Sequence, residues 1–349
     1  MRVRVNMLPS LTCLHLHPRC HPTHSARPAP VGVPRPQPPE SPGQSLLRAS
    51  QDGNLARVQE LLASPGIDVN LRNDRGRTAL IVATVRGHAE IVRMLLAVPG
   101  INVNLGDIEG ETPLKWASLE GRTDILRMLL DVPGIDVNLG DDGGRTALMV
   151  AMVRGYAEIV RMLLDDTRIN VNLRDAIGRT ALTEAIYYGH AEIVRMLLDV
   201  PGIDVNLTGA GGDPALLQAT TERRTDILRM LLDVRGINVN LANEDGETAL
   251  WWASSGGQTE IVQMLLDDAR IDVNQADTNG ETALIRASYK GHAEIVQMLL
   301  DVPGIDVSAK TNSGFTALFF ANKMGHDAIE EMLLAKIGRN WSRLPWSRR

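Results

Sequence analysis

Short runs of apolar residues, spaced as on one face of a helix, recur along most of this chain, and residues 178–206 show the pattern most clearly. Two groups there have the i, i+1, i+4, i+5 spacing of a one-sided helix: Ala181, Leu182, Ala185 and Ile186, followed by Ile193, Val194, Leu197 and Leu198. The pattern therefore predicts two short helices, each burying one face.

Residues that start and stop helices border both groups. Thr180 stands where an N-cap hydroxyl accepts a backbone N–H, and Gly189 stands where a left-handed residue ends the first helix. Glu192 lies in the first turn of the second helix, where the helix dipole favours an anion. Pro201 and Gly202 then end that helix, and residues 203–206 form an extended segment. The predicted unit is a helix, a turn, a second helix and an extended loop.

The same unit returns every 34 residues, in register with a glycine that lies four positions before a leucine. These glycines are Gly76, Gly110, Gly144, Gly178, Gly212, Gly246, Gly280 and Gly314. A fixed period of this length indicates stacked supersecondary units that contact their neighbours. We therefore predict an all-α solenoid of about nine helix-turn-helix repeats with short extended turn loops.

The unit resembles the ankyrin repeat. From residue 44 to about 334 the chain follows the ankyrin pattern G-x-T-P-L-H-x-A-A-x-x-G-H-x-E-I-V-x-L-L-L, which ends in D-V-N. The resemblance implies the ankyrin fold and a protein-binding function. Three departures are general: the proline after the threonine is kept only as Pro113, the motif's first histidine is absent from every unit, and the loop after the second helix is one residue longer. Alanine in place of the proline still favours helix initiation.

A fourth departure is confined to the unit that begins at Gly212. Pro214 replaces the N-cap threonine there, and Arg223 replaces the glycine that ends the first helix. Each change is expected to cost on the order of 1 kcal/mol. We therefore predict that residues 208–226 form the least stable joint of the solenoid.

The chain divides into three regions. We assign residues 1–43, which are rich in Pro and His, to a disordered tail, residues 44–334 to the solenoid, and residues 335–349 to a basic tail with two tryptophans. Within the solenoid, residues 44–70 and 308–334 are expected to be capping repeats around the central repeats 71–307, because polar residues replace some of the apolar ones found in the central units.

Both cysteines, Cys13 and Cys20, lie in the N-terminal tail among four histidines. A zinc site is one interpretation of this cluster. The spacing matches no zinc template, however, and we expect a disordered tail without metal. Because residues 44–334 contain no cysteine, disulfides play no part there, which fits a reducing compartment. We expect a cytoplasmic location, with a nuclear one left open.

The predicted solenoid is acidic, with 26 basic and 41 acidic residues between positions 44 and 334. This net charge argues against nucleic acid as the partner of the solenoid. The sequence lacks the common nucleotide-binding, zinc-protease and serine-hydrolase motifs, and four histidines, such as His190, all occupy the turn before the second helix. We therefore predict a monomer without enzymatic activity, cofactor or membrane span.

Two functional hypotheses follow. The first is a protein-binding scaffold or adaptor, and the second is a subunit that recruits substrates to a larger enzyme complex through its terminal tails. In the ankyrin family the partner lies against the turn tips and the exposed residues of the first helices. The corresponding candidate residues here are Arg145, Arg154, Arg179, Tyr187, Tyr188, Asp213, Glu222, Asp245, Glu247, Trp251, Tyr289 and Lys290. For the tryptophan, filling between units is an equally open interpretation.

The charges at these positions have the same sign within most units, and from residue 145 onward the sign changes once, from basic to acidic. Pairing between adjacent units, through Arg77, Glu111 and Arg145, is an alternative that accounts for the first three units alone. A partner segment with acidic and basic ends would use the change of sign to fix its direction. We therefore predict an extended, charge-segregated protein partner bound between about residues 145 and 290.

Overall fold

The computed structural model describes residues 40–341, with side chains through residue 338. Eighteen α-helices and one short 3₁₀ helix make up the ordered elements of these residues. The first helices of the repeats are α1 (Pro42–Asp52), α3 (Ala79–Arg86), α5 (Pro113–Leu119), α7 (Ala147–Arg154), α9 (Ala181–Tyr188), α11 (Ala215–Thr221), α13 (Ala249–Ser255), α15 (Ala283–Lys290) and α17 (Ala317–Met324). The second helices are α2 (Leu55–Leu62), α4 (Ala89–Leu96), α6 (Thr123–Leu130), α8 (Ala157–Leu164), α10 (Ala191–Leu198), α12 (Thr225–Leu232), α14 (Thr259–Leu266), α16 (Ala293–Asp301) and α18 (Asp327–Trp341).

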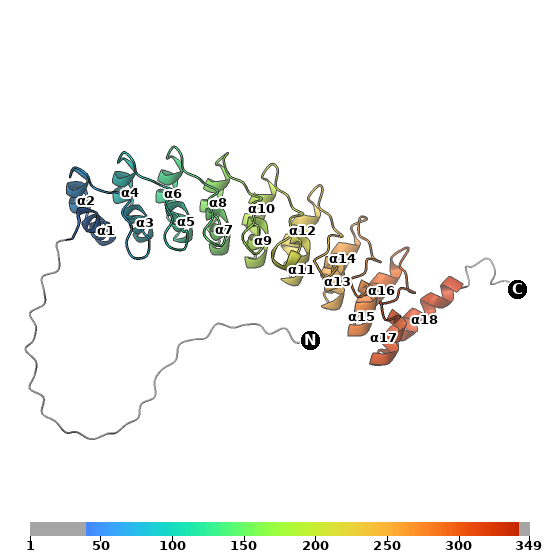
Figure 1. Ribbon diagram of the computed structural model, residues 1–349. Coiled ribbons are helices and arrows are strands. Elements are labelled where there is room, and N and C mark those ends of the chain that lie inside the picture. Colours follow the sequence, from blue (N-terminus) through green and yellow to red (C-terminus); the bar gives the residue numbers. More distant parts are fainter. Residues whose placement is uncertain (1–39, 342–349) are drawn as a thin grey trace, which may run out of the picture. The chain divides into compact units, whose positions relative to one another are not determined.

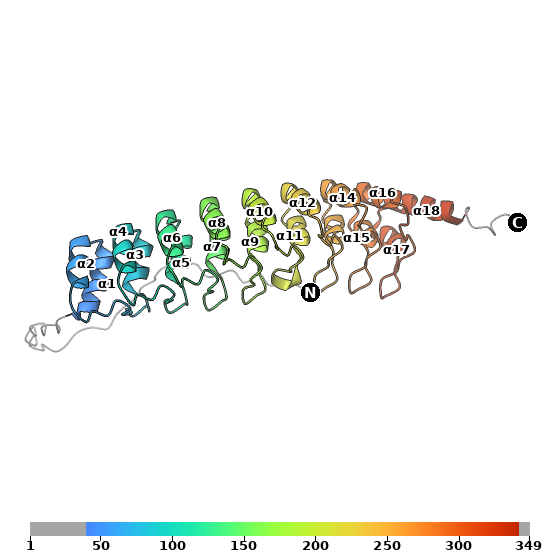
Figure 2. The same ribbon diagram turned by 90° about the horizontal axis from the view of Figure 1, so that it is seen from above.

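The helix pairs stand side by side in one row, in the order of the sequence (Figure 1). First helices pack on first helices of the neighbouring repeats, and second helices pack on second helices, so that two layers run along the row (Figure 2). The turns between repeats project from one side of the first-helix layer (Figure 2). The predicted all-α solenoid of nine repeats is confirmed for the part of the chain that the structure describes.

The predicted helix caps form in the repeats that keep the motif. Thr180 has an extended backbone, and its hydroxyl accepts the backbone N–H of Thr183 at 3.2 Å. Gly189 adopts a φ of 74° and ends α9, a conformation that a side chain disfavours. A methionine recurs at one position of the second helix in eight repeats, and seven of these eight methionines pack against the core: Met94, Met128, Met162, Met196, Met264, Met298 and Met332. The exception is Met230, which lines a pocket described below.

The histidines at the start of the second helices link adjacent repeats. The ring nitrogen Nε2 of His292 lies 3.2 Å from the carbonyl oxygen of Ser255, and that of His326 lies 3.3 Å from the carbonyl oxygen of Tyr289. The ring of His292 also lies over Gly257, where a Cβ atom would come within 2.8 Å of it. These contacts give His292 and His326 a structural role between adjacent repeats.

Both expected boundaries of the solenoid at residues 43/44 and 334/335 need correction. Helix α1 begins at Pro42, because Ser41 forms a capping box with Gln44. Helix α18 continues to Trp341, whereas the earlier second helices are eight or nine residues long. Ile337 of this extension packs against the core. Within residues 40–341, no helix has the length and apolar character that a membrane crossing requires.

The repeat that begins at Gly212 departs from the others in its backbone. Pro214 provides no side-chain cap, and Arg223 has a φ of 55°, which makes it the one non-glycine residue with positive φ in the described chain. In neighbouring repeats the side chain of Asp175 or Asn243 accepts two turn N–H groups, but Gly209 stands at that position.

Hydrogen bonds between successive turns are also interrupted at this repeat. Elsewhere one turn donates to the preceding turn, as Ala176 N does to Gly143 O at 2.8 Å and Thr278 N does to Asp245 O at 2.9 Å. Within the described chain, no corresponding bond joins residues 209–212 to the turn on either side. The predicted weak joint therefore has more local causes than the two substitutions seen in the sequence.

Candidate functional site

The basic part of the candidate site lies at the end of α7 and on the turns that precede α7 and α9. Arg154 is the last residue of α7 and is exposed, whereas Arg145 and Arg179 precede their helices and are half-buried. Arg179 holds two carboxylates, with Nη2 at 2.7 Å from Asp175 Oδ2 and Nη1 at 2.9 Å from Glu184 Oε1. We call Arg145, Arg154 and Arg179 the basic segment.

Glu184, which is not among the candidate residues, interacts with two arginines of the basic segment. Its side chain is buried on the inner side of α9, and both Arg179 and Arg145 act on its carboxylate. Burial raises the pKa of Glu184, and the two guanidinium groups oppose that shift without cancelling it. Glu184 is thus an ion-pair partner of Arg179, and the charge of Arg145 on the preceding repeat acts on it from a longer distance. An acid among the apolar residues of a first helix was the sequence signal for it.

The predicted tyrosine pair is exposed at the end of α9. Tyr187 keeps 51% of its surface accessible and Tyr188 keeps 41%. Their ring centroids lie 5.1 Å apart in an edge-to-face arrangement. Large exposed aromatic side chains beside charged groups are typical anchors of protein interfaces.

The acidic part of the site is organised by an asparagine. Nδ2 of Asn243 lies 3.2 Å from Asp213 Oδ1 and 3.2 Å from Glu247 Oε2, so the amide links acids from two adjacent repeats. Trp252 adds a bond from its indole N–H to Glu247 Oε2 at 2.9 Å. Burial raises the pKa of Asp213, and the nearby Asp245 acts in the same direction.

Asp245 itself is exposed, and Glu222 is half-buried at the end of the first helix of its repeat. Together with Asp213 and Glu247 they form what we call the acidic segment. The basic and acidic segments thus occupy equivalent positions in consecutive repeats.

Trp251 is wrong as a candidate contact residue, because it is buried with 5% of its surface accessible. The guanidinium of Arg286, from the following repeat, lies 4.6 Å from its ring centroid and covers it. Equivalent positions in other repeats, such as Met149 and Ile285, are buried in the same way. The tryptophan therefore fills the space between repeats, and the apolar residues at this position carried that signal in the sequence.

Tyr289 and Lys290 form a separate, mixed group at the end of α15. Tyr289 is half-buried, with its ring edge-to-face with Phe320 at 5.5 Å between centroids. Lys290 is exposed, with its ammonium 5.5 Å from the centre of the Tyr289 ring. The structure places this pair with the aromatic residues of the last repeat, apart from the tyrosines of α9.

The alternative of charge pairing through Arg77, Glu111 and Arg145 does not describe the contacts. Arg77 pairs with Asp107 at 3.2 Å, and Glu111 pairs with Lys115 at 3.2 Å. Among residues 40–338, no carboxylate lies within ion-pair distance of Arg145.

The outer face of the second helices carries a separate ladder of arginines. Arg93 pairs with Glu90 of its own helix at 3.5 Å, whereas Arg161 reaches Glu192 of the next repeat at 3.9 Å. All four of these side chains are more than half exposed. Pairs of this kind contribute little to stability.

Within residues 40–338, no group of three or more His, Cys, Asp or Glu side chains is arranged to hold a metal ion. The cysteine and histidine cluster of the N-terminal tail lies outside the described residues, as do residues 342–349 of the basic tail. The chemistry of the site is that of an open surface of charged and aromatic side chains.

Stacked helix pairs with a continuous, variable face of turns and first helices define a repeat protein of the interaction-module class. A family model described as "Ankyrin repeats (3 copies)" matches residues 46–141, 132–209, 202–277 and 269–342. The chain belongs to the ankyrin repeat family. Ankyrin repeats in general are protein–protein interaction modules, and their fold is typically non-catalytic.

A solved structure agrees with this assignment. The ankyrin repeat protein EF0377 is 34% identical to this chain, with a TM-score of 0.50. The match covers 54% of this chain and 96% of that one. The comparison with curated proteins gives no significant match.

Proposed function

We propose that this protein is a non-catalytic scaffold or adaptor that binds an extended, charge-segregated segment of a partner protein along its turn tips and first helices. The acidic end of the partner's peptide contacts the basic segment of this chain. The basic end of the peptide contacts the acidic segment. An apolar or aromatic residue between the two ends packs on Tyr187 and Tyr188. Lys290 and Tyr289 mark the far limit of the contact region.

One observation carries this proposal. The charge at equivalent positions changes sign between Arg179 and Asp213. Within residues 40–338, none of the three arginines of the basic segment forms an ion pair with a carboxylate of the acidic segment. Charge complementarity of this kind guides association and fixes the register of a bound segment. The exposed tyrosine pair lies at the same place and supplies the apolar contact that charges alone lack.

The long open face favours an adaptor over an enzyme, because catalysis needs groups that converge in a pocket. The cysteine-free solenoid fits a reducing compartment, so we place the protein in the cytoplasm. We also propose that it is a monomer. No described residue favours the recruitment of substrates to an enzyme complex over this role.

Selection of random peptides displayed on phage, with the full chain as bait, tests the proposal without a known partner. Enriched peptides are expected to carry acidic residues at one end, basic residues at the other and an aromatic or aliphatic residue between them. The same selection against a variant with Tyr187→Ala and Tyr188→Ala should lose that central preference. Enrichment without charge segregation would overturn the proposal.

A further inference from the structure

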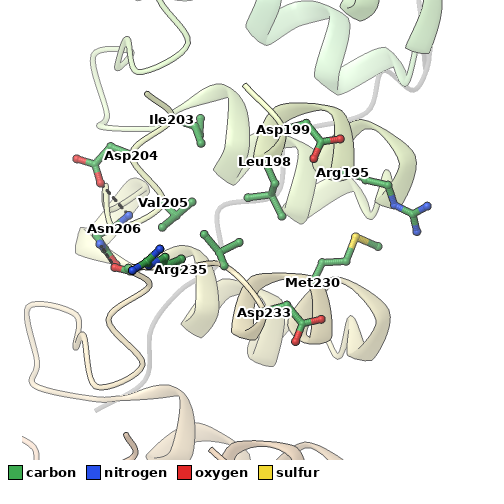
Figure 3. Close-up of a pocket in the computed structure, with 12 residues that line it drawn as sticks. Arg195, Leu198, Asp199, Ile203, Asp204, Val205, Asn206, Met230, Asp233 and Arg235 are labelled. Carbon is green, nitrogen blue, oxygen red and sulfur yellow. Dashed lines mark hydrogen bonds between the residues drawn. The ribbon is translucent and has the colours of Figure 1, made fainter. Parts of the chain in front are cut away.

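A pocket of about 600 Å³ opens between the C-terminal ends of α10 and α12, in the layer of second helices and away from the charged segments. Leu198 and Met230 face each other across it, and Asp199 and Asp233 lie on opposite sides (Figure 3). Arg195 also borders the pocket, but its guanidinium points away from Leu198 (Figure 3). The pocket is therefore lined by apolar and charged side chains together, and Asp199, Asp233 and Arg235 are among the charged ones.

Two other repeats fill the equivalent place with an arginine of their own, whereas glycine stands there at residues 100, 134, 202 and 304. Nη2 of Arg168 donates to the carbonyl oxygen of Leu130, the last residue of α6, at 3.0 Å. Nη2 of Arg270 donates in the same way to Leu232, the last residue of α12, at 3.0 Å. At the end of the row, the ammonium of Lys336 donates to the carbonyl oxygen of Leu300. The groove after a second helix can therefore take a long cationic side chain.

Leu198 is the last residue of α10 and lacks this partner. The residue in register with Arg168 and Arg270 is Gly236, which has no side chain to send into the groove. Within residues 40–338, no donor reaches the Leu198 carbonyl oxygen. The end of a helix carries partial negative charge on such free carbonyls, and cations are stabilised there.

We propose that this pocket binds an arginine side chain presented by a partner protein. The guanidinium donates to the Leu198 carbonyl oxygen and lies between the carboxylates of Asp199 and Asp233. Its aliphatic stem packs on Leu198 and Met230, as long charged side chains do along apolar surfaces. Arginine is favoured because its planar fork donates several hydrogen bonds at once, as Arg168 and Arg270 do in their own grooves.

The probe for the test is a short acetylated peptide amide, Ala-Ala-Arg-Ala-Ala, titrated into the full chain with ¹³C-labelled methyl groups. Saturable shifts are expected for the methyl groups of Met230 and Leu198. A peptide with citrulline in place of arginine keeps the shape and loses the charge, and it should bind at least roughly tenfold more weakly. The double variant Asp199→Asn and Asp233→Asn should weaken arginine binding by roughly three- to tenfold.

A loop exchange gives the decisive variant. Val234→Asp, Arg235→Ala and Gly236→Arg together copy residues 268–270 of the next repeat, so the new arginine is expected to reach Leu198 and abolish peptide binding. The matched control makes the same exchange at residues 132–134 and leaves this pocket unchanged, so it should keep full binding.

Circular dichroism spectra that match the wild type show that both exchanged chains are folded. Equal shifts with arginine and citrulline, or arginine binding that survives the exchange at 234–236, would overturn the proposal. The turn-tip surface takes no part in this test, so its result is independent of the proposed adaptor site.

Discussion

The side-chain amide of Asn172 donates a hydrogen bond to the carbonyl oxygen of Gly202, in the following repeat, at 2.8 Å. Its Oδ1 at the same time accepts the backbone N–H of Asp204 at 2.9 Å. The same double contact is made by Asn70, Asn104, Asn138, Asn206, Asn240 and Asn274. This double contact needs a donor and an acceptor on one short side chain. Asparagine has both, whereas an ionised aspartate has only acceptors.

Replacing Asn172 with Asp should therefore lower the free energy of unfolding by about 1–2 kcal/mol, because the Gly202 carbonyl then faces a second acceptor. Asp204→Asn is the matched control. Asp204 acts only as an acceptor for Asn206 N–H, and Asn170 does the same in the preceding repeat. Urea unfolding followed by circular dichroism measures both variants. Equal stabilities would show that the amide bridge does not couple the repeats.

Arg223→Gly should stabilise the repeat at 212, because its φ of 55° is a conformation that glycine adopts without strain. A gain of about 1 kcal/mol is expected. Amide hydrogen exchange in the wild type should show faster exchange in residues 208–226 than in residues 178–198, and the variant should narrow that difference. Protection that is already equal in the two segments would contradict the weak joint.

Lys115 is a buried cation between two repeats, with its ammonium 3.2 Å from Glu111 Oε1 and in contact with Asp141 Oδ2. Lys115→Ala should cost about 3 kcal/mol, because it leaves two largely buried carboxylates unpaired. The exposed Lys290→Ala is the control and should change stability little. Thermal unfolding at pH 7 compares the two, and equal losses would mean that the pairing adds nothing.

The same lysine predicts a pH dependence. Burial acts to raise the pKa of Asp141, but hydrogen bonds from Lys115 and from backbone N–H groups outweigh it and hold that pKa below 3.8. Asp141 therefore contributes stability above its ordinary pKa that is lost as the pH falls through the lower folded value. As the pH falls, the Lys115→Ala variant should therefore lose less folding stability than the wild type does.

Glu184 should have the opposite pH dependence. Its pKa is raised above 4.5, chiefly by burial, so the folded protein holds the proton more tightly than the unfolded chain does. Its contribution is present below pH 4.5 and is lost as the pH rises through the raised value. Glu184→Gln should remove this loss and raise stability at pH 7, while Arg179 keeps Asp175 as its partner. The exposed Glu192→Gln is the control, and a lower melting temperature for Glu184→Gln than for Glu192→Gln would contradict this explanation.

The sequence was sufficient to predict the fold because each repeat carries its own caps. Thr180 and Gly189 mark the ends of α9 as the structure has them. It also identified Pro214 and Arg223 as defects, but the missing bonds between turns depend on backbone positions that no single repeat specifies. The continuation of α18 beyond residue 334 could not be predicted from a missing Pro-Gly pair, because α8 and α14 end without one.

The candidate site could be predicted only in part. Tyr187 and Tyr188 are exposed at the end of a first helix. This place does not by itself dictate exposure, because Tyr289, at the position equivalent to Tyr187, packs against Phe320 of the next repeat. The burial of Trp251 depends on Arg286 of the next repeat, and the role of Glu184 depends on Arg145 of the preceding one. Contacts between repeats decide both cases, and these contacts lie outside the pattern of any one unit.

The change of sign between the basic and acidic segments is tested most directly by association kinetics. A peptide selected on the full chain is mixed by stopped flow with the wild type and with the variant Arg145→Glu, Arg154→Glu and Arg179→Glu. The control variant, Arg127→Glu, Arg161→Glu and Arg229→Glu, makes the same change of net charge on the outer face of the second helices. We expect the first variant to associate roughly tenfold more slowly, with a weaker dependence on salt, and the control to behave nearly as the wild type. Equal association rates for the two variants would contradict the proposed site.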